Sequence, residues 1–454
     1  MMPQHVELSD AAKATASGPH LQLRRVLGMR DLVSMIVGSV IGSGIFLVPG
    51  AVLRAVDKSV TLAAMAWFAG GVLSLLGALT YGELSAMKPQ TGGLYVYIRD
   101  CFGSLTAFLF GWTMFFVISS GTIAGLAVAF SAYLGEFLKL SAPAAKAVSI
   151  LMIATITAIN VRGTRQSADL LNLTTTIKVT AILLMSIALL WVGRNPLPSA
   201  RGSLTHSNST FSGFGLAMIS VLWAYEGWQY ATYSAGEIVD PQRNFPRAFF
   251  TGLAALIGIY LFANLGYLVA LGPEGVSSSS RVAASAVAAV IGIGIAKLVA
   301  IAILISMFSA ANSMILTAPR VYYAMAKDRL FFKRFSEVHP RFGTPAFAII
   351  GTGTWSAVLA ASGTFEQLLT YVVSIGWIFY ALAAASIFVY RRRAPDAVRP
   401  FRVPGYPLTP LIFILSAMGL VGNTAARQPG QVTIGLGIVF LGVPAYLFWQ
   451  RKVK

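Results

Sequence analysis

Long apolar stretches recur from one end of the chain to the other, and they restrict the possible folds more than any other feature. Only 11% of the 454 residues are charged, and the mean hydropathy is +0.72. A membrane-spanning helix needs about 20 apolar residues, and within a bilayer the backbone must satisfy its own hydrogen bonds. The sequence therefore predicts an all-α integral membrane protein with about twelve transmembrane helices and no large soluble domain. We expect the helices near residues 32–53, 62–87, 105–138, 144–160, 170–192, 214–233, 249–271, 298–325, 346–361, 368–390, 411–422 and 432–448, with a polar, turn-rich link at 88–99 and a short outer helix within 273–294.

The basic residues indicate how the chain is oriented. When the N-terminus and every second loop are placed on one side, that side holds roughly three times as many Lys and Arg residues as the other. Such a bias is typical of the cytoplasmic side, and it accounts for the net charge of +18 without a nucleic-acid partner. We therefore expect an even number of spans and two cytoplasmic termini, with residues 1–27 forming a polar tail rather than a signal peptide.

Two of the expected helices are interrupted near their middle. The first contains Gly42-Ser43-Gly44 within the apolar run Val37–Phe46, and the sixth contains Glu226-Gly227 within Trp223–Tyr230. A break at this depth leaves N–H and C=O groups unpaired, which is tolerated only where they face protein, water or a ligand. Such groups, at the opposite ends of two helix dipoles, suit a zwitterion. Interrupted helices in two inverted halves are typical of a transporter with a substrate site at the membrane midplane; a kink or a close helix crossing is the alternative.

Two ionisable side chains fall inside the expected helices. Lys178 lies in the fifth, where a charge is costly, so its amine should face the bundle interior and pair with or coordinate another group. Snorkelling to the membrane surface is the alternative. Because burial disfavours the charged amine, Lys178 could also lose its proton during a transport cycle. Glu226 could pair with a cation, orient the unwound segment through hydrogen bonds, or carry a proton.

Several other classes of function lack support in the sequence. The single cysteine, Cys101, excludes an internal disulfide framework, and the four histidines have no metal-ligand spacing. The segment Gly351-Thr352-Gly353 lacks the third glycine of a dinucleotide loop. We therefore expect neither a metal nor a cofactor. A membrane-embedded transferase would need a cluster of acids or histidines near one face, and a channel would need a ring of filter residues; the sequence contains neither.

Four motifs in order resemble the amino acid–polyamine–organocation permeases, and the resemblance is strongest toward the L-amino-acid transporter branch with its bacterial members. They are Gly42–Phe46, Pro89–Gly93, Trp223–Trp228 and Thr317–Ala326. The resemblance implies the leucine-transporter fold, in which two inverted repeats of five helices are followed by two more helices. The implied domains are a cytoplasmic tail (1–27), a first repeat (28–195), a second repeat (196–393), and two final helices with a short cytoplasmic C-terminus (394–454).

The resemblance also implies roles for individual residues. Backbone amides at the first break would bind the substrate α-carboxylate, and carbonyls at both breaks would hold its α-amino group. One aromatic side chain would cover the substrate, and two residues would border the pocket for its side chain. A lysine of the fifth helix would replace the sodium ion of sodium-coupled relatives, tethering the first helix to the fifth and eighth. The amides are those of Ser43, Gly44 and Ile45, and the carbonyls are those of Val40, Ile41, Trp223 and Ala224. Trp223 is the covering aromatic residue, Glu226 and Gly227 border the side-chain pocket, and Lys178 is the lysine of the fifth helix.

Two further segments bear on coupling and partners. Residues 308–313 lack the adjacent Thr-Ser pair that sodium-coupled relatives use in the eighth helix. Animal members of the branch bind a heavy-chain glycoprotein through a cysteine after the third helix, and residues 138–143 contain no cysteine. We therefore expect sodium-independent transport and no disulfide-linked heavy chain. The sequence leaves open whether the protein forms a homo-oligomer.

The function expected from these observations is secondary transport of L-amino acids across the cytoplasmic membrane by alternating access, as an exchanger or a proton-coupled permease. The aromatic border formed by Trp223 and Tyr225 favours substrates with neutral side chains. Because Glu226 could admit a basic group, a cationic amino acid or polyamine permease is the alternative, and an integral-membrane transferase is a remote one.

Overall fold

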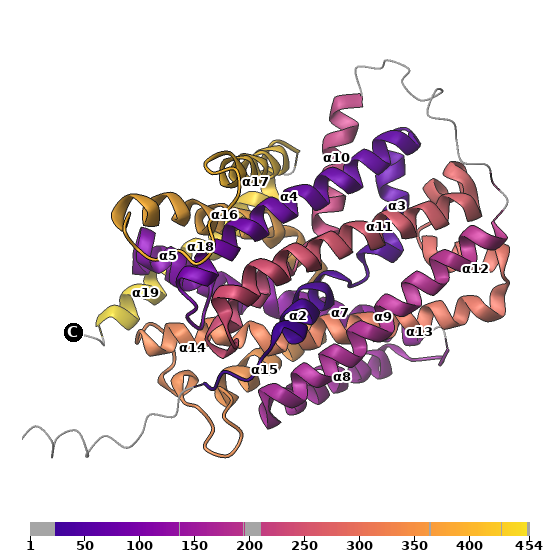
Figure 1. The fold of residues 1–454 in the computed structure, drawn as a ribbon. Coiled ribbons are helices and arrows are strands. Elements are labelled where there is room, and N and C mark those ends of the chain that lie inside the picture. Colours follow the sequence, from indigo (N-terminus) through magenta and orange to yellow (C-terminus); the bar gives the residue numbers. More distant parts are fainter. Residues whose placement is uncertain are drawn as a thin grey trace, which may run out of the picture.

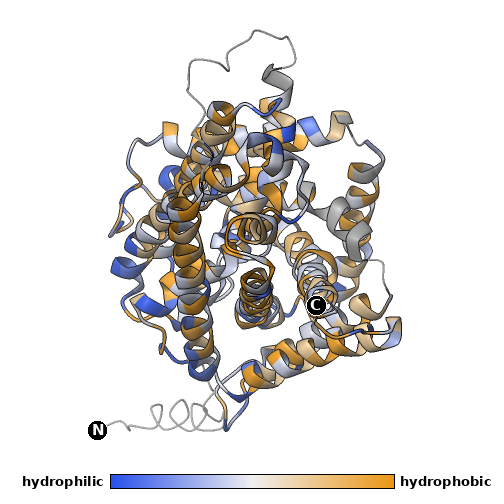
Figure 2. Ribbon diagram, turned by 90° about the vertical axis from the view of Figure 1, so that its right-hand side faces the viewer, coloured by the Kyte–Doolittle hydropathy of each residue, from blue (hydrophilic) through white to orange (hydrophobic). Residues whose placement is uncertain are grey.

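The computed structural model describes residues 23–135, 137–193, 195, 210–362, 365–427 and 429–451. These residues form helices joined by short loops, and their only β-type pairing is an isolated bridge between Leu27 and Ile238. Figure 1 shows the long helices running side by side, and Figure 2 shows that hydrophobic residues cover most of their length. The prediction of an all-helical chain is confirmed for the described residues.

Eight helices in this part of the chain are long and apolar enough to cross a membrane, or nine if the bent pair α2 (Met29–Val40) and α3 (Gly44–Ala55) forms one span. Helices α10 (Thr210–Ala224) and α15 (Ala346–Ser362) are apolar but shorter. The number of twelve spans therefore stays a prediction. The eight spans are α4 (Val60–Met87), Ser104–Leu134 (α6, η1 and α7), α8 (Ala142–Arg162), α9 (Thr164–Val192), α11 (Pro241–Ser278), Ile293–Lys327 (α13 and α14), Leu408–Ala426 of α17, and Val432–Arg451 of α18 and α19.

The connecting segments differ in part from the predictions. The expected polar link begins as a turn, with positive φ angles at Gly92 and Gly93, but its second half is a buried helix, α5 (Leu94–Phe102). The prediction of a link without a helix was therefore wrong for this half. A short helix does occur within residues 273–294, as α12 (Val282–Val290).

Both predicted helix breaks are present. Helices α2 and α3 meet at an angle of 46° across three residues that are not helical. Helix α10 ends at Ala224, and after a short turn the chain continues as the 3₁₀ helix η3 (Trp228–Glu237) instead of an α-helix. Each break leaves backbone groups without partners in the same helix, as the sequence pattern predicted.

The first broken helix lies in the middle of the bundle. Helix α2 contacts α9, α11, α13 and η3 (Figure 1). Two glycines allow these close contacts: a Cβ atom on Gly38 would lie 2.7 Å from Thr175 Oγ1 of α9, and one on Gly252 of α11 would lie 3.0 Å from Ile36. The surrounding helices therefore fix the position of the break through direct packing.

Candidate functional site

Residues of the first break line a cavity. Gly42 N–H bonds to the carbonyl of Val40 at 2.9 Å, and α3 then begins at Gly44. The first amides of a helix have no carbonyl partner one turn earlier, and they form the positive end of the helix dipole. Ser43 and Gly44 line a cavity of about 300 Å³. Such a helix start is well suited to bind a carboxylate.

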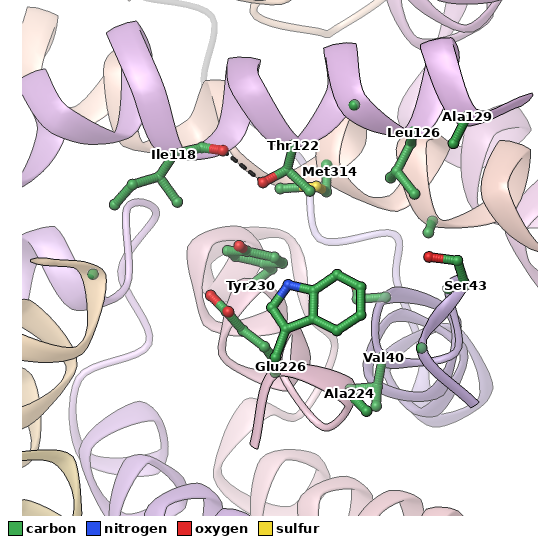
Figure 3. A pocket seen from close by; sticks show the side chains of 17 residues that line it. Val40, Ser43, Ile118, Thr122, Leu126, Ala129, Ala224, Glu226, Tyr230 and Met314 are labelled. Carbon is green, nitrogen blue, oxygen red and sulfur yellow. Dashed lines mark hydrogen bonds between the residues drawn. The ribbon is translucent and has the colours of Figure 1, made fainter. Parts of the chain in front are cut away.

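The cavity lies between the two broken helices and three further helices, α7 (Ser119–Leu134), α13 (Ile293–Thr317) and α16 (Phe365–Arg393). Figure 3 shows Glu226 and Tyr230 beside one another, Ser43 on the side of the first break, and Thr122 with Leu126 of α7 opposite them. The lining residues are Ser39, Val40, Gly42, Ser43, Gly44, Ile118, Thr122, Gly125, Leu126, Ala129, Trp223, Ala224, Glu226, Tyr230, Ala310, Met314 and Gly376.

The structure brings most of the predicted site residues to this cavity. Six of them line it: Val40, Ser43, Gly44, Trp223, Ala224 and Glu226. The other predicted backbone contributors, Ile41 and Ile45, are fully buried next to the first break and are not part of the lining. Gly227 has a φ of +126°, and a Cβ atom there would lie 3.0 Å from the backbone of Ser39. A glycine at this position therefore allows the two broken helices to touch.

Lys178 lies beneath the first break and not in the cavity. Its side chain is fully buried, and its Nζ donates to the carbonyls of Gly38 and Ile41, each at 2.7 Å. Both carbonyls belong to the end of α2, where the helix stops and cannot use them. The full burial excludes the alternative in which the amine reaches the membrane surface. The amine instead ties α9 to the interrupted first helix.

Two hydroxyl groups that the sequence interpretation missed hold the same region. Ser306 of α13 contacts the carbonyls of Ile41 and Gly42, both at 2.9 Å. Tyr260 of α11 places its hydroxyl 3.2 Å from the carbonyl of Val40 and 3.0 Å from that of Ala224. One tyrosine hydroxyl therefore contacts the last helical carbonyls of both broken helices. A signal was present, since a buried tyrosine in an apolar helix usually finds a partner for its hydroxyl.

These contacts affect the carbonyls that were predicted to hold an amino group. The Val40 carbonyl contacts the Gly42 N–H and the Tyr260 hydroxyl, and the Ile41 carbonyl contacts Lys178 and Ser306. The Ala224 carbonyl contacts the Tyr260 hydroxyl, and the Trp223 carbonyl accepts the Glu226 N–H at 3.2 Å. A carbonyl oxygen has two lone pairs. The carbonyls of Trp223 and Ala224, each with one such partner, can therefore accept a further hydrogen bond.

Glu226 provides the only carboxyl group among the described residues that line the cavity, and none of them carries an amine or a guanidinium group. Its Oε1 accepts a hydrogen bond of 2.9 Å from the Tyr380 hydroxyl of α16. None of the ion pairs in the described part of the chain involves Glu226. The carboxyl group is therefore held in place by a neutral donor, and it could serve a bound cation or a proton.

A buried ion pair closes one end of the bundle. Arg320 of α14 (Pro319–Lys327) bonds to Glu237 at 2.7 and 3.1 Å, and Thr164 at the start of α9 bonds to both side chains at 2.9 Å. Arg320 and Glu237 are almost completely buried. The backbone of Leu27 also pairs with the chain on either side of Ile238. The start of α2, the end of η3 and the starts of α9 and α14 are thereby held together.

Comparison with known proteins adds independent information. A family model described as amino acid permease matches residues 27–442. The chain is similar to the serine/threonine exchanger SteT of Bacillus subtilis (strain 168), with 30% identity over 435 residues that cover 95% of this chain and 98% of that protein. It is also similar to the large neutral amino acids transporter small subunit 2 of Mus musculus, with 29% identity over 459 residues covering 99% and 86% of the two chains. The cystine/glutamate transporter of Homo sapiens is 29% identical over 442 residues, covering 96% and 87%.

Proposed function

The chain belongs to the amino acid permease family, and we propose that it carries L-amino acids across the cytoplasmic membrane by sodium-independent alternating access. Membership makes it a multi-pass membrane transporter and not an enzyme, and its relatives are named as amino acid exchangers or transporters. The observation that carries the proposal is the first helix break, where Ser43 and Gly44 line the cavity while Lys178 bonds to the carbonyls of Gly38 and Ile41.

The proposed topology has twelve spans with both termini in the cytoplasm. Residues 28–195 and 196–393 form two inverted repeats, and residues 394–454 add two helices and a short tail. The interrupted helices α2–α3 and α10–η3 support this arrangement, because each is the first helix of its proposed repeat. Their direct contact at Gly227 and Ser39 is also expected when a substrate site lies between inverted halves.

The substrate backbone is proposed to bind across the two breaks. Amides of Ser43, Gly44 and Ile45 receive the α-carboxylate, since they form the positive start of α3. Carbonyls at the ends of the preceding helices receive the α-amino group. Trp223, which lies in the last turn of α10 and is 43% exposed, covers the substrate. Of the four carbonyls that the resemblance implied, those of Trp223 and Ala224 are proposed for the amino group, since those of Val40 and Ile41 already have two partners each.

Sodium independence is supported by the position of Lys178. Its amine contacts two helix-end carbonyls at 2.7 Å, and such carbonyls are the ligands that an alkali cation would use at a broken helix. A fixed positive charge at this point makes a bound cation unnecessary. The free energy for accumulation would then come from exchange or from a proton gradient.

The side-chain pocket supports neutral amino acids as the first candidate. Its lining is largely apolar and includes Ile118, Leu126 and Met314. A cationic amino acid or a polyamine is the second candidate, and the specific observation that favours it is Glu226, a carboxyl group in the lining without an ion-pair partner in the described residues. A protonated Glu226 would fit the neutral candidate, and an ionised one would fit the cationic candidate.

The proposed transporter works without a disulfide-linked heavy chain. The mouse relative is named a small subunit, but the one cysteine of this chain, Cys101, is buried on α5 with its thiol 3.6 Å from the carbonyl of Ser386. Burial raises the pKa of the Cys101 thiol, which keeps it in the unreactive protonated form.

Uptake of radiolabelled amino acids into proteoliposomes tests the proposal. Each neutral and cationic amino acid is measured with empty vesicles, with unlabelled amino acid inside, and with an inward proton gradient, in sodium and in potassium buffer. We expect equal uptake in both buffers. Uptake that requires internal amino acid identifies an exchanger, and uptake that collapses with the proton gradient identifies a symporter. Uptake that requires sodium contradicts the proposed role of Lys178.

A further inference from the structure

A second cavity lies away from the substrate pocket, where the end of α4 meets the start of α11. It has a volume of about 620 Å³. Leu79 of α4 forms one side, the first turns of α11 form another, and Pro400, Phe401 and Pro404 of the loop between α16 and α17 form the third. Helices α4 and α11 pack against each other along their length (Figure 1). We refer to this cavity as the α4–α11 groove.

The wall formed by the α16–α17 loop is firmly attached. Glu83, near the end of α4, is almost completely buried and accepts the N–H of Val403 at 2.7 Å. The same carboxylate receives two hydrogen bonds from Arg391, at 2.9 and 2.7 Å. Gly82 lies between the walls, since a Cβ atom there would be 3.6 Å from both Phe401 and Pro246. The hydrogen bonds of the buried Glu83 carboxylate therefore fix this wall of the groove.

Two arginines give the groove its charge. Arg243 and Arg247 lie one turn apart on α11, and both are exposed. Neither takes part in an ion pair within the described residues. Like charges at this spacing repel each other, and cations near a helix start oppose the helix dipole. An anion in the groove would relieve both effects.

The remaining lining of the groove is mainly apolar. Phe250 follows Arg247 on the same face of α11 and is 56% exposed. Ala254, one turn further into the apolar part of this span, is also exposed. Along α11, the two exposed arginines are thus followed by exposed apolar residues that lie in the membrane-spanning part of the helix. A soluble anion would use only the arginines, whereas a lipid would use both parts.

We propose that the α4–α11 groove binds an anionic phospholipid of the leaflet on the side of the basic loops. The lipid phosphate contacts Arg243 and Arg247, because guanidinium groups form paired hydrogen bonds with phosphate oxygens. One acyl chain lies along Phe250 and Leu79. Anionic lipids are enriched in the cytoplasmic leaflet, which is the side that the loop charges indicate for these residues.

Lipid binding to the purified, delipidated full-length chain in neutral detergent tests this proposal. Native mass spectrometry counts retained molecules of phosphatidylglycerol and of phosphatidylcholine, and soluble glycerol phosphate is added as a competitor. We expect retention of phosphatidylglycerol over phosphatidylcholine, with no displacement by glycerol phosphate. The double variant Arg243→Gln/Arg247→Gln should weaken phosphatidylglycerol binding about tenfold or more, while the exposed control Arg392→Gln should bind as the wild type does.

Phe250→Ala tests the acyl-chain part separately. It should weaken phosphatidylglycerol binding although both arginines remain, and gel filtration with thermal unfolding checks that each variant is folded. Equal retention of the two lipids would overturn the proposal, as would unchanged binding by the folded double variant. Displacement by glycerol phosphate, or full binding by Phe250→Ala, would show that the groove takes a soluble anion and not a lipid.

Discussion

At the residue scale, the first break is held by side chains that use carbonyls released by helix α2. Lys178, Ser306 and Tyr260 come from three different helices, α9, α13 and α11, and each contacts the carbonyls of residues 38–42. Of these three side chains, only Lys178 was identified from the sequence. Each bond to a charged group contributes about 1.5–3 kcal/mol, so the lysine is the strongest of the three contacts.

Replacing Lys178 by Met should abolish most transport without unfolding the protein. The change removes two charge-assisted hydrogen bonds while keeping a long apolar side chain, so we expect the uptake rate to fall about tenfold or more. Uptake into proteoliposomes, with gel filtration for folding, measures this. Lys297→Met is the control, because Lys297 is exposed at the start of α13 and should tolerate the change. Full transport by the Lys178 variant would refute its proposed role.

Replacing Tyr260 by Phe should weaken substrate binding and leave the fold intact. The ring still fills its site, but the carbonyls of Val40 and Ala224 lose their common donor, which costs about 1–3 kcal/mol. We expect the KM for the amino acid to rise roughly tenfold. Tyr267→Phe is a matched control on the same helix, since its buried hydroxyl has no hydrogen-bond partner in the described structure. Equal KM values for both variants would argue against the positioning role of Tyr260.

At the scale of the elements, the two interrupted helices depend on a backbone contact. Gly227 has a φ of +126°, a conformation that residues with a side chain rarely adopt, and a Cβ atom there would lie only 3.0 Å from the Ser39 backbone. Backbone atoms cannot move aside as the end of a flexible side chain can. The contact of α2 with η3 therefore requires glycine at this position.

The variant Gly227→Ala should be less stable than the wild type by about 1–3 kcal/mol. Thermal unfolding in detergent measures the loss as a lower melting temperature. Gly258→Ala in α11 is the control, since no atom lies within 4 Å of the added Cβ, and alanine favours the helix by about 1 kcal/mol. A Gly227 variant as stable as the control would show that the two broken helices have room to separate.

At the scale of the whole molecule, the Arg320–Glu237 pair and Thr164 form a cluster that joins the proposed repeats. Thr164 belongs to the first repeat, while Glu237 and Arg320 belong to the second, and all three meet in a buried cluster. Breaking a buried pair leaves a charge without compensation. An exposed pair, such as Lys58 with Glu274, contributes little because water screens it.

Glu237→Gln should therefore destabilise the protein by about 3–5 kcal/mol, whereas Glu274→Gln should change stability by about 1 kcal/mol or less. Thermal unfolding of the two variants under identical conditions gives the comparison. The double variant Glu237→Gln/Arg320→Met should be less destabilised than the sum of its two single changes, because it also removes the uncompensated arginine. Similar melting temperatures for the Glu237 and Glu274 variants would mean that the buried cluster does not hold the halves together.

The sequence by itself determined the class of structure, the positions of the breaks and the placement of Lys178 inside the bundle. These follow from local rules: apolar runs must be helical in a membrane, glycines and a carboxyl group in mid-span mark an interruption, and a charge at that depth needs partners. The helix α5 was missed because its side chains are buried by tertiary contacts that a local polarity count does not include.

Only the tertiary structure decided which groups meet. The partners of Lys178 lie about 140 positions away along the chain, and Tyr260 contacts the ends of two helices, α2 and α10, that are far apart in the sequence. The α4–α11 groove likewise depends on the Glu83 carboxylate holding a loop that follows more than 300 positions later. Such contacts depend on how the helices pack, and helix packing is set by the three-dimensional fit of many side chains and not by the pattern within any one helix.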